Sequence, residues 1–196
     1  MNSRLSKNEM LRKAIHISGF LIPLIYVQFF STHLVSLALL LTIIIYATSE
    51  VARKHEMNFP VFSTVTRKAA KSIFEINHFA TAPIAFTSGI ILSLLIFPPT
   101  IAYTSIVVLT LGDSFASVFG KIFGKTPLLF NRNKTLEGTF CGFICAFLGS
   151  ILFVTPMKAL VAVGVGMLAE ALPLPIDDNL VIPLSAGMAL IVFSSL

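Results

Sequence analysis

Long apolar runs alternate with short polar breaks along this chain, and the pattern predicts membrane-spanning helices. Several of the runs are shorter than the ~20 residues of a full span, a difference that tilt or local thinning of the bilayer accommodates. The breaks are terse, as at Ser31-Thr32 and Pro98-Pro99-Thr100, which predicts antiparallel neighbours. The seven apolar segments cover residues 14–30, 33–48, 79–97, 101–123, 138–154, 159–172 and 180–196, and the sixth is the weakest because it is short and rich in Gly and Ala.

The composition agrees with a membrane protein. Hydrophobic residues make up 56% of the 196 residues and charged residues only 12%, whereas a soluble domain usually carries about a quarter charged residues. No polar linker of useful length divides the chain. We therefore expect an all-α, polytopic transmembrane bundle formed by a single domain over residues 1–196, with 1–13 as a cytoplasmic tail and 101–196 as the catalytic core. The basic start leads into the first span without a small-residue cleavage site, so we expect no cleaved signal peptide.

The basic residues occupy alternate loops. The N-terminal tail and the loops after the second and fourth segments hold all but one of the 14 Lys and Arg residues, the exception being Lys158. The positive-inside rule then predicts a cytoplasmic N-terminus and a C-terminus on the other side. The carboxylates fall on the same predicted side, as expected for a site that handles a charged, water-soluble compound. The almost uncharged opposite face argues against a transporter, and topology explains the basic residues without nucleic acid.

The fourth segment ends in LGDSFASVFGKIFGKT, residues 111–126, which looks at first like a phosphate-binding loop. A Walker A motif needs a glycine five positions before Gly124, where Phe119 stands, and it opens a helix that follows a strand. Helical periodicity explains the stretch better. Small residues recur every fourth position from 112 to 124 and form a ridge for close helix packing, either within the chain or in a homo-oligomer. A polar stripe beside the ridge begins at Asp113 in mid-membrane, where a carboxylate usually contacts a cation, a substrate or a partner helix.

Two later stretches carry further candidate residues. In NRNKTLEGTF, residues 131–140, Lys134, Thr135 and Glu137 stand where the fifth segment begins. A helix start with an adjacent lysine suits a phosphate, although Thr-x-Glu is also typical of a simple helix cap.

The second stretch, AEALPLPIDDNLVIPL, spans residues 169–184 and combines Glu170 with Asp177, Asp178 and Asn179. Several hard oxygen donors together suit Mg²⁺, which is usually held by a few carboxylates and the phosphates of its substrate. Capping of the seventh helix explains one of these residues but not the set. Near the N-terminus, Arg12 and His16 share a helix face with Gly19, and for His16 a packed histidine is at least as plausible as a catalytic one.

Taken in order, these motifs resemble the CTP-dependent lipid kinase family, which includes dolichol and other polyprenol kinases, phytol kinases and CTP-dependent diacylglycerol kinases. The set covers nearly the whole chain and is far more specific than any one motif. A more distant similarity to CDP-diacylglycerol synthases leaves a cytidylyltransferase as an alternative, although their longer basic-acidic C-terminal signature is missing. The matching residues are Arg12-Lys13, His16, Gly19, Glu50, Arg53, Gly112-Asp113, Ala116, Gly120, Gly124-Lys125, Lys134-Thr135, Glu137-Gly138, Glu170, Asp177-Asp178-Asn179-Leu180 and Pro183.

The resemblance implies an integral membrane enzyme that phosphorylates a lipid alcohol from CTP, with a divalent cation, at the cytoplasmic face. The membrane would be the cell membrane in a prokaryote or the endoplasmic reticulum in a eukaryote. We expect Asp113 to act as the base, with Glu137 the second candidate, and Glu170 to support the metal. The remaining expected roles are metal binding by Asp113, Asp177 and Asp178, nucleotide or phosphate binding by Lys125, Lys134, Thr135 and Asn179, and accessory roles for Arg12 and His16.

Overall fold

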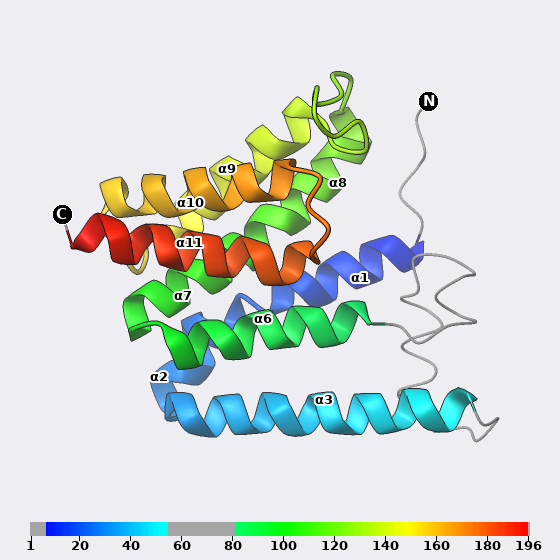
Figure 1. The fold of residues 1–196 in the computed structure, drawn as a ribbon, viewed down its shortest axis with the longest axis vertical. Helices are drawn as coiled ribbons and strands as arrows, with labels where there is room; N and C mark the ends of the chain where they lie inside the picture. Colours follow the sequence, from blue (N-terminus) through cyan, green and yellow to red (C-terminus); the bar gives the residue numbers. More distant parts are fainter. Residues whose placement is uncertain (1–6, 55–80, 196) are drawn as a thin grey trace.

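The computed structural model describes residues 7–54 and 81–195, and all regular structure in these two ranges is helical (Figure 1). Each predicted apolar segment becomes a helix or a chain of helices. Their ends shift by a few residues where prolines start helices at Ala82–Ile96, Pro99–Val107 and Pro156–Ala171, because proline is well suited to the first helical turn. The elements are α1 (Lys7–Ser18), η1 (Ile22–Tyr26), α2 (Val27–Phe29), α3 (Thr32–Lys54), α6 (Ala82–Ile96), α7 (Pro99–Val107), η2 (Val108–Asp113), α8 (Ser114–Phe123), α9 (Leu136–Ser150), α10 (Pro156–Ala171) and α11 (Asp178–Ser194).

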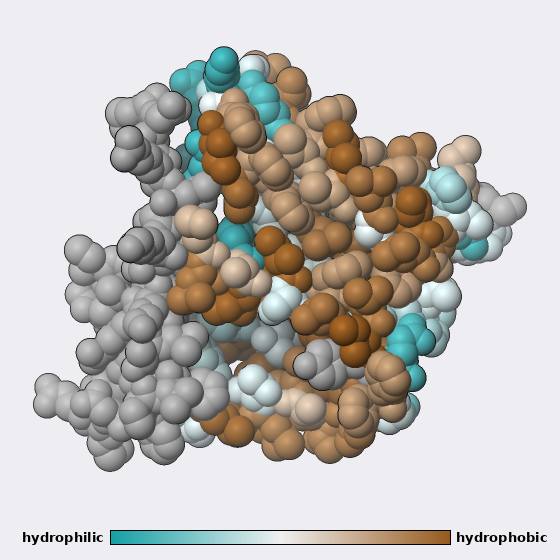
Figure 2. Space-filling view, turned by 180° about the vertical axis from the view of Figure 1, so that it is seen from behind, coloured by the Kyte–Doolittle hydropathy of each residue, from teal (hydrophilic) through white to brown (hydrophobic). Residues whose placement is uncertain are grey.

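The helices form a membrane bundle. Among the described residues, three helical stretches are long and apolar enough to cross a bilayer, namely Glu9–Phe29, Thr32–Ala52 and Pro99–Phe123, and α6, α9 and α11 are shorter apolar helices. Large apolar side chains cover most of the face in Figure 2, and on α3 residues such as Leu37 and Leu41 are about half exposed. Such a surface is stable against lipid and would be a liability in water. The predicted helical membrane bundle is confirmed.

The fourth segment contains a feature that the sequence did not predict. We expected one continuous α-helix over 101–123, but a π-helical turn, η2, separates α7 from α8. Such turns occur mostly as short insertions and are frequent at functional sites. Val108, Leu109 and Thr110 within it are fully buried, and the turn ends at Asp113.

The glycine ridge of α8 packs inside the chain, against α9. A Cβ atom on Gly138 would lie 2.5 Å from the Ala116 carbonyl oxygen and 2.7 Å from Gly120 Cα, and one on Gly142 would lie 2.5 Å from the Gly112 carbonyl oxygen. The two backbones therefore touch, as small residues on facing helices allow. Of the two roles that the sequence left open for the ridge, the structure shows the internal helix pair.

The ends of several helices meet at one end of the bundle. In Figure 1 the start of α1, the α8–α9 connection and the start of α11 lie on one side, and the C-terminus lies at the opposite end. Between the two ends, α7 and η2 pack against α9, α10 and α11 around a dry centre. The fully buried apolar residues of this centre include Ile106, Leu109, Val163 and Ile182.

Candidate functional site

A polar cavity of about 530 Å³ opens at the end of the bundle where these helices meet. This volume lies within the range of small-molecule sites. It is lined by residues of α1, the start of α6, the end of η2, α8, the α8–α9 loop, α9, the end of α10 and the start of α11. It brings together most of the predicted site residues: Arg12, His16, Asp113, Lys134, Thr135, Glu170, Asp177, Asp178 and Asn179.

One wall of the cavity is built around Asp113. Lys13 Nζ lies 2.7 Å from Asp113 Oδ2 and compensates the charge of the carboxylate, and His16 Nδ1 lies 3.7 Å from the same oxygen. The His16 ring stacks on Phe86 of α6, with the ring centroids 4.1 Å apart. The Lys13 and Asp113 side chains are both mostly buried, at 6% and 13% exposed, where the mutual attraction of opposite charges is strong. This pair fastens α1 to the end of η2.

The other wall is built around Lys134. Its Nζ lies 2.7 Å from Asp178 Oδ2 and 2.9 Å from Glu170 Oε1, and it also donates to the main-chain carbonyl of Glu170. This carbonyl belongs to the last turn of α10, where carbonyl oxygens lack helical partners and cations are favoured. One lysine therefore joins the α8–α9 loop to the end of α10 and the start of α11.

The electrostatics of Lys134 favour its charged form. Partial burial lowers the pKa of the ammonium, but the neighbouring Glu170 and Asp178 carboxylates outweigh this effect and raise the pKa above its usual value. A lysine held in this way remains a permanent positive charge at the mouth of the cavity. Such a charge suits the phosphates of a nucleotide.

Buried polar atoms without partners gather around the same cavity. Glu170 Oε2, Asn179 Oδ1 and Thr139 Oγ1 lack a hydrogen-bond partner within the described part of the chain, as do Arg12 Nε and His16 Nδ1. All five residues line the cavity. Because buried polar groups are nearly always satisfied, such a cluster indicates a place where a polar ligand or water completes the bonding.

In the part of the chain that the structure describes, the carboxylates predicted to bind a metal are engaged with other side chains. Within residues 7–54 and 81–195, no group of three or more His, Cys, Asp or Glu side chains lies close enough to hold a metal ion. Lys13 stands against Asp113 and Lys134 against Asp178, and Asp177 Oδ1 accepts hydrogen bonds from the main-chain and side-chain nitrogens of Asn179. Asp177 is therefore the N-cap of α11, the simpler of its two predicted roles. We assign no chemical step to a protein-bound metal.

Two predicted residues lie apart from the cavity lining. Lys125 is exposed. Glu137 holds the α8–α9 loop: its Oε1 accepts from Thr126 N at 3.1 Å and from Thr126 Oγ1 at 2.9 Å. The hydrogen bond from its own main-chain N–H, together with those from Thr126 and from the Lys125 backbone, outweighs the opposing effect of desolvation and lowers the pKa of this carboxyl to about 2. Thr135 is the N-cap of α9, accepting from Gly138 N, and it also lines the cavity.

Sequence reasoning missed the roles of Lys13, Lys121 and Glu9. The sequence placed Lys13 in the motif set and Lys121 among the basic residues after the fourth segment, and it predicted no carboxylate partner for either. In the structure Lys121 of α8 forms an ion pair with Glu9 of α1, and both residues line the cavity. The spacing of Glu9, Lys13 and His16 on one face of α1 was the available signal. Their partners could not be chosen without the tertiary structure.

Glu50 and Gly19 of the motif set do not line the cavity. Glu50 is buried on α3 and is not among the residues that line the cavity. The Arg53 side chain and the basic residues of the 55–80 segment lie outside the described residues. Gly19 closes the turn after α1, where a Cβ would lie 2.8 Å from Thr110 Cγ2 and 2.9 Å from Phe86 Cζ. It is therefore a packing residue.

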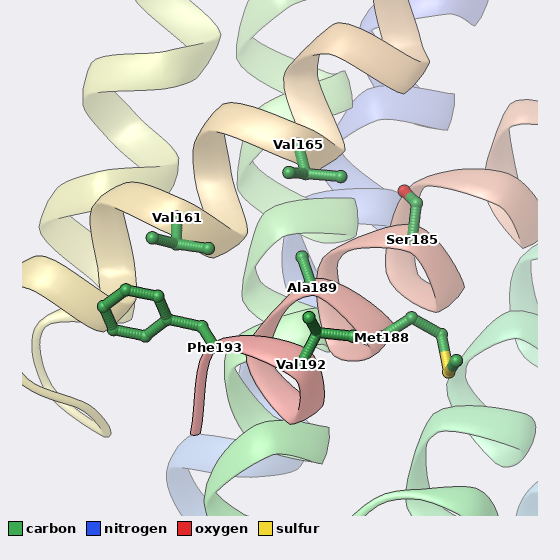
Figure 3. A pocket seen from close by; sticks show the side chains of 7 residues that line it. All are labelled: Val161, Val165, Ser185, Met188, Ala189, Val192 and Phe193. Carbon is green, nitrogen blue, oxygen red and sulfur yellow. The ribbon is translucent and has the colours of Figure 1, made fainter. Parts of the chain in front are cut away.

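A second hollow, of about 520 Å³, lies between α10 and α11 and is almost wholly apolar. Figure 3 shows Val161 and Val165 of α10 facing Ala189 and Val192 of α11, with Ser185 the one polar side chain labelled. No titratable group lines it. It suits contact with hydrocarbon and has no catalytic chemistry.

The fold and the cavity define a class: a polytopic membrane protein with a charged, nucleotide-sized site at one end of its bundle. Comparison with known proteins narrows the class. The chain is 29% identical over 206 residues to the CTP-dependent diacylglycerol kinase 1 of Schizosaccharomyces pombe, covering 94% of this chain and 93% of that protein. It is also 29% identical to an uncharacterized protein of Rickettsia prowazekii, covering 94% of each.

A probable phytol kinase of Glycine max is 29% identical over 133 residues, which are 58% of this chain and 46% of that protein. No family model and no solved structure matches the chain. The named relatives confirm the resemblance to the CTP-dependent lipid kinase family that the motif set indicated.

Proposed function

We propose that this protein is a CTP-dependent lipid kinase that transfers the γ-phosphoryl group of CTP to the hydroxyl of a membrane lipid at the cytoplasmic face. The observation that carries this proposal is the cavity at the end of the membrane bundle, where paired lysines and carboxylates from five segments meet: α1, η2, the α8–α9 loop, α10 and α11. The named relatives support CTP as the donor and a diacylglycerol or phytol-type alcohol as the acceptor. A polyprenol or dolichol acceptor belongs to the same proposal through the motif resemblance.

Lys134 and Lys13 are the proposed phosphate contacts. Both are cations at the cavity and both are partly or wholly buried, so they act in a medium where charge interactions are strong. Thr135 and Asn179 line the same space and supply further polar contacts. Lys125, which is exposed and lies apart from the cavity lining, is replaced by Lys13 in this proposal.

Asp113 is the proposed base. It lies at the end of a buried π-helical turn, next to Lys13 and His16. In the transfer step the acceptor hydroxyl gives its proton to the Asp113 carboxylate as its oxygen bonds to the γ-phosphorus. The bond between that phosphorus and the β–γ bridging oxygen breaks in line, and CDP leaves. The alternative base, Glu137, uses its carboxylate to hold Thr126, which favours Asp113.

The test is a paired panel of nucleotides and acceptors. The purified protein in lipid vesicles is given CTP or ATP labelled in the γ-phosphate, in the presence of Mg²⁺, with diacylglycerol, phytol, polyprenol or dolichol. We expect label in a phospholipid product from CTP, with CDP released. Release of pyrophosphate with a CMP-bearing lipid would instead identify a cytidylyltransferase. Failure of every lipid alcohol to take up the γ-phosphate would refute the kinase proposal.

Asp113→Asn is the first variant to test. We expect loss of transfer by at least about 10²-fold, the lower range for a removed general base. The variant should still insert and keep its helix content, which circular dichroism in detergent measures. Ser117→Ala is the matched control, because Ser117 approaches the same carboxylate only at 3.5 Å. Full activity of Asp113→Asn would remove Asp113 from the mechanism.

A further inference from the structure

The loop between α8 and α9, residues 124–135, presents two large apolar side chains to the outside. Leu129 is 92% exposed and Phe130 is 76% exposed. Most other exposed apolar side chains lie along helices, although connections such as the one between α10 and α11 also carry some, including Leu174 at 42% and Ile176 at 59% exposed. Leu129 and Phe130 stand side by side at the tip of a loop, among residues 131–134 with the polar sequence NRNK.

The tip is held by a hydrogen-bonded loop. Leu136 N donates to the Thr126 carbonyl at 2.9 Å, Leu128 N to the Lys134 carbonyl at 2.9 Å, and Lys134 N to the Asn131 carbonyl at 3.0 Å. Glu137 ties down Thr126 from the start of α9. These hydrogen bonds fix the backbone of the loop. The Leu129 and Phe130 side chains are therefore held outward and do not fold back onto the bundle.

The charges of the loop are all of one sign. Every charged residue between positions 121 and 135 is Lys or Arg. Lys121 is paired with Glu9, and Lys134 with Glu170 and Asp178. Lys125 and Arg132 are exposed and form no ion pair with the residues described in the structure. Two free cations thus flank an apolar tip.

The position of the loop places the tip beside the bilayer. Its two ends continue into α8 and α9, which pack together within the membrane bundle. Figure 1 shows this connection at the top of the molecule, displaced to the side of the bundle rather than above its axis. Hydrophilic residues gather at the corresponding top edge in Figure 2, next to the apolar face.

We propose that residues 124–135 form an interfacial anchor that binds anionic lipid. Leu129 and Phe130 insert among the lipid headgroups, and Lys125 and Arg132 bind the phosphates of anionic lipids. Apolar side chains flanked by basic ones are typical of segments that lie in the membrane interface, and each basic residue near an anionic surface strengthens the attraction. The bilayer is the favoured occupant because both ends of the loop continue into helices of the membrane bundle.

The anchor also bears on the cavity. Lys134 belongs to the same hydrogen-bonded loop and forms the ion pairs with Glu170 and Asp178. An anchored tip would therefore also restrict the position of Lys134 in the cavity. This consequence depends on the proposed function, but the insertion itself does not.

The chain contains no tryptophan, so Phe130→Trp introduces a single tryptophan at the tip, whose emission is recorded with excitation that avoids tyrosine. The full-length variant is reconstituted in phosphatidylcholine vesicles with and without phosphatidylglycerol, using lipids brominated either near the headgroup or near the chain end. We expect blue-shifted emission, protection from aqueous iodide, and stronger quenching by the shallow bromine than by the deep one. Ile144→Trp on α9 is the control, since this half-exposed position in mid-helix should be quenched best by the deep bromine.

The basic residues are tested in the same background. Phosphatidylglycerol should increase the shallow quenching of Phe130→Trp, and the added substitutions Lys125→Gln and Arg132→Gln should abolish that increase. An unchanged increase in this triple variant would overturn the lipid-phosphate contacts. Water-like emission with free access to iodide and no bromine quenching would overturn the anchor and favour a soluble protein partner. None of these measurements depends on catalysis, so their outcome tests the anchor even if the kinase assay fails.

Discussion

Lys134 compensates the charge of the buried Glu170 carboxylate. Glu170 is only 2% exposed, and its Oε2 has no partner among the described residues. An ionised carboxylate in such a place is costly unless a cation is near. The lysine supplies that cation and at the same time joins three segments, so a site residue and a structural residue are the same side chain.

This dual role predicts a non-additive pair of substitutions. Lys134→Gln should lower the free energy of unfolding by about 3–5 kcal/mol, because it leaves a buried charge without its partner. Glu170→Gln added to it should restore most of the loss, since the uncompensated charge is then removed. Chemical unfolding in detergent micelles measures the two single variants and the double variant, with exposed Arg132→Gln as the control. Losses that simply add would show that the pair is not coupled.

Glu137 predicts a pH dependence at the loop. Its folded pKa of about 2 lies below the ordinary 4.5, so ionisation favours the folded loop. The contribution is complete above about pH 4.5 and fades as the pH falls toward 2. The difference in melting temperature between the wild type and Glu137→Gln should therefore grow from pH 2 to pH 5 and then level off. All other titrating groups are the same in the wild type and in Glu137→Gln, so their effects cancel in the difference. A difference in melting temperature that does not change with pH would contradict the low pKa of Glu137.

At the scale of elements, the contact between α8 and α9 depends on glycine where a side chain has no space. A Cβ on Gly138 would meet backbone atoms of Ala116 and Gly120 at 2.5 and 2.7 Å. Backbone atoms cannot move aside for a new Cβ as the end of a flexible side chain can. Alanine at position 138 would therefore force α8 and α9 apart. Gly138→Ala should lower the thermal stability in detergent by several degrees and reduce the yield of inserted protein.

Gly164 on α10 offers the matched control, because a Cβ there meets nothing within 4 Å. Gly164→Ala should leave the melting temperature unchanged or raise it slightly, since alanine favours a helix by about 1 kcal/mol over glycine. Equal losses in the two variants would show that helix propensity or insertion, rather than the α8–α9 contact, sets the effect.

The sequence predicted the helices well and their cross-contacts poorly, for a physical reason. Apolar periodicity and small-residue spacing are local, so the seven segments and the ridge from Gly112 could be read from neighbouring positions. The extra residue of η2 could not, because a π-helical turn depends on packing around Thr110 rather than on a distinctive motif. The partners of Lys13 and Lys134 lie 100 and 36–44 residues away. Only the assembled bundle selects them from the available carboxylates.

At the scale of the whole molecule, charge is concentrated at one end. The start of α1, the α8–α9 loop and the start of α11 lie there together, and the C-terminus lies at the other end (Figure 1). Lys158, at the start of α10, is the exception that the basic-residue pattern placed on the opposite side. The positive-inside rule predicts that the charged end is cytoplasmic. Under the proposed function, the cavity would then share a compartment with CTP, and the acceptor would reach it from within the bilayer.

This orientation predicts the outcome of a labelling experiment. In a background with Cys141→Ser and Cys145→Ser, which removes both native cysteines, single cysteines are placed at Asn133 and at Met157. Asn133 is exposed at the cavity end and Met157, 61% exposed, lies in the first turn of α10. In sealed right-side-out vesicles an impermeant maleimide should label Met157→Cys at once and Asn133→Cys only after permeabilisation. The reverse order would invert the topology, place the cavity away from CTP, and refute the proposed cytoplasmic reaction while leaving the fold intact.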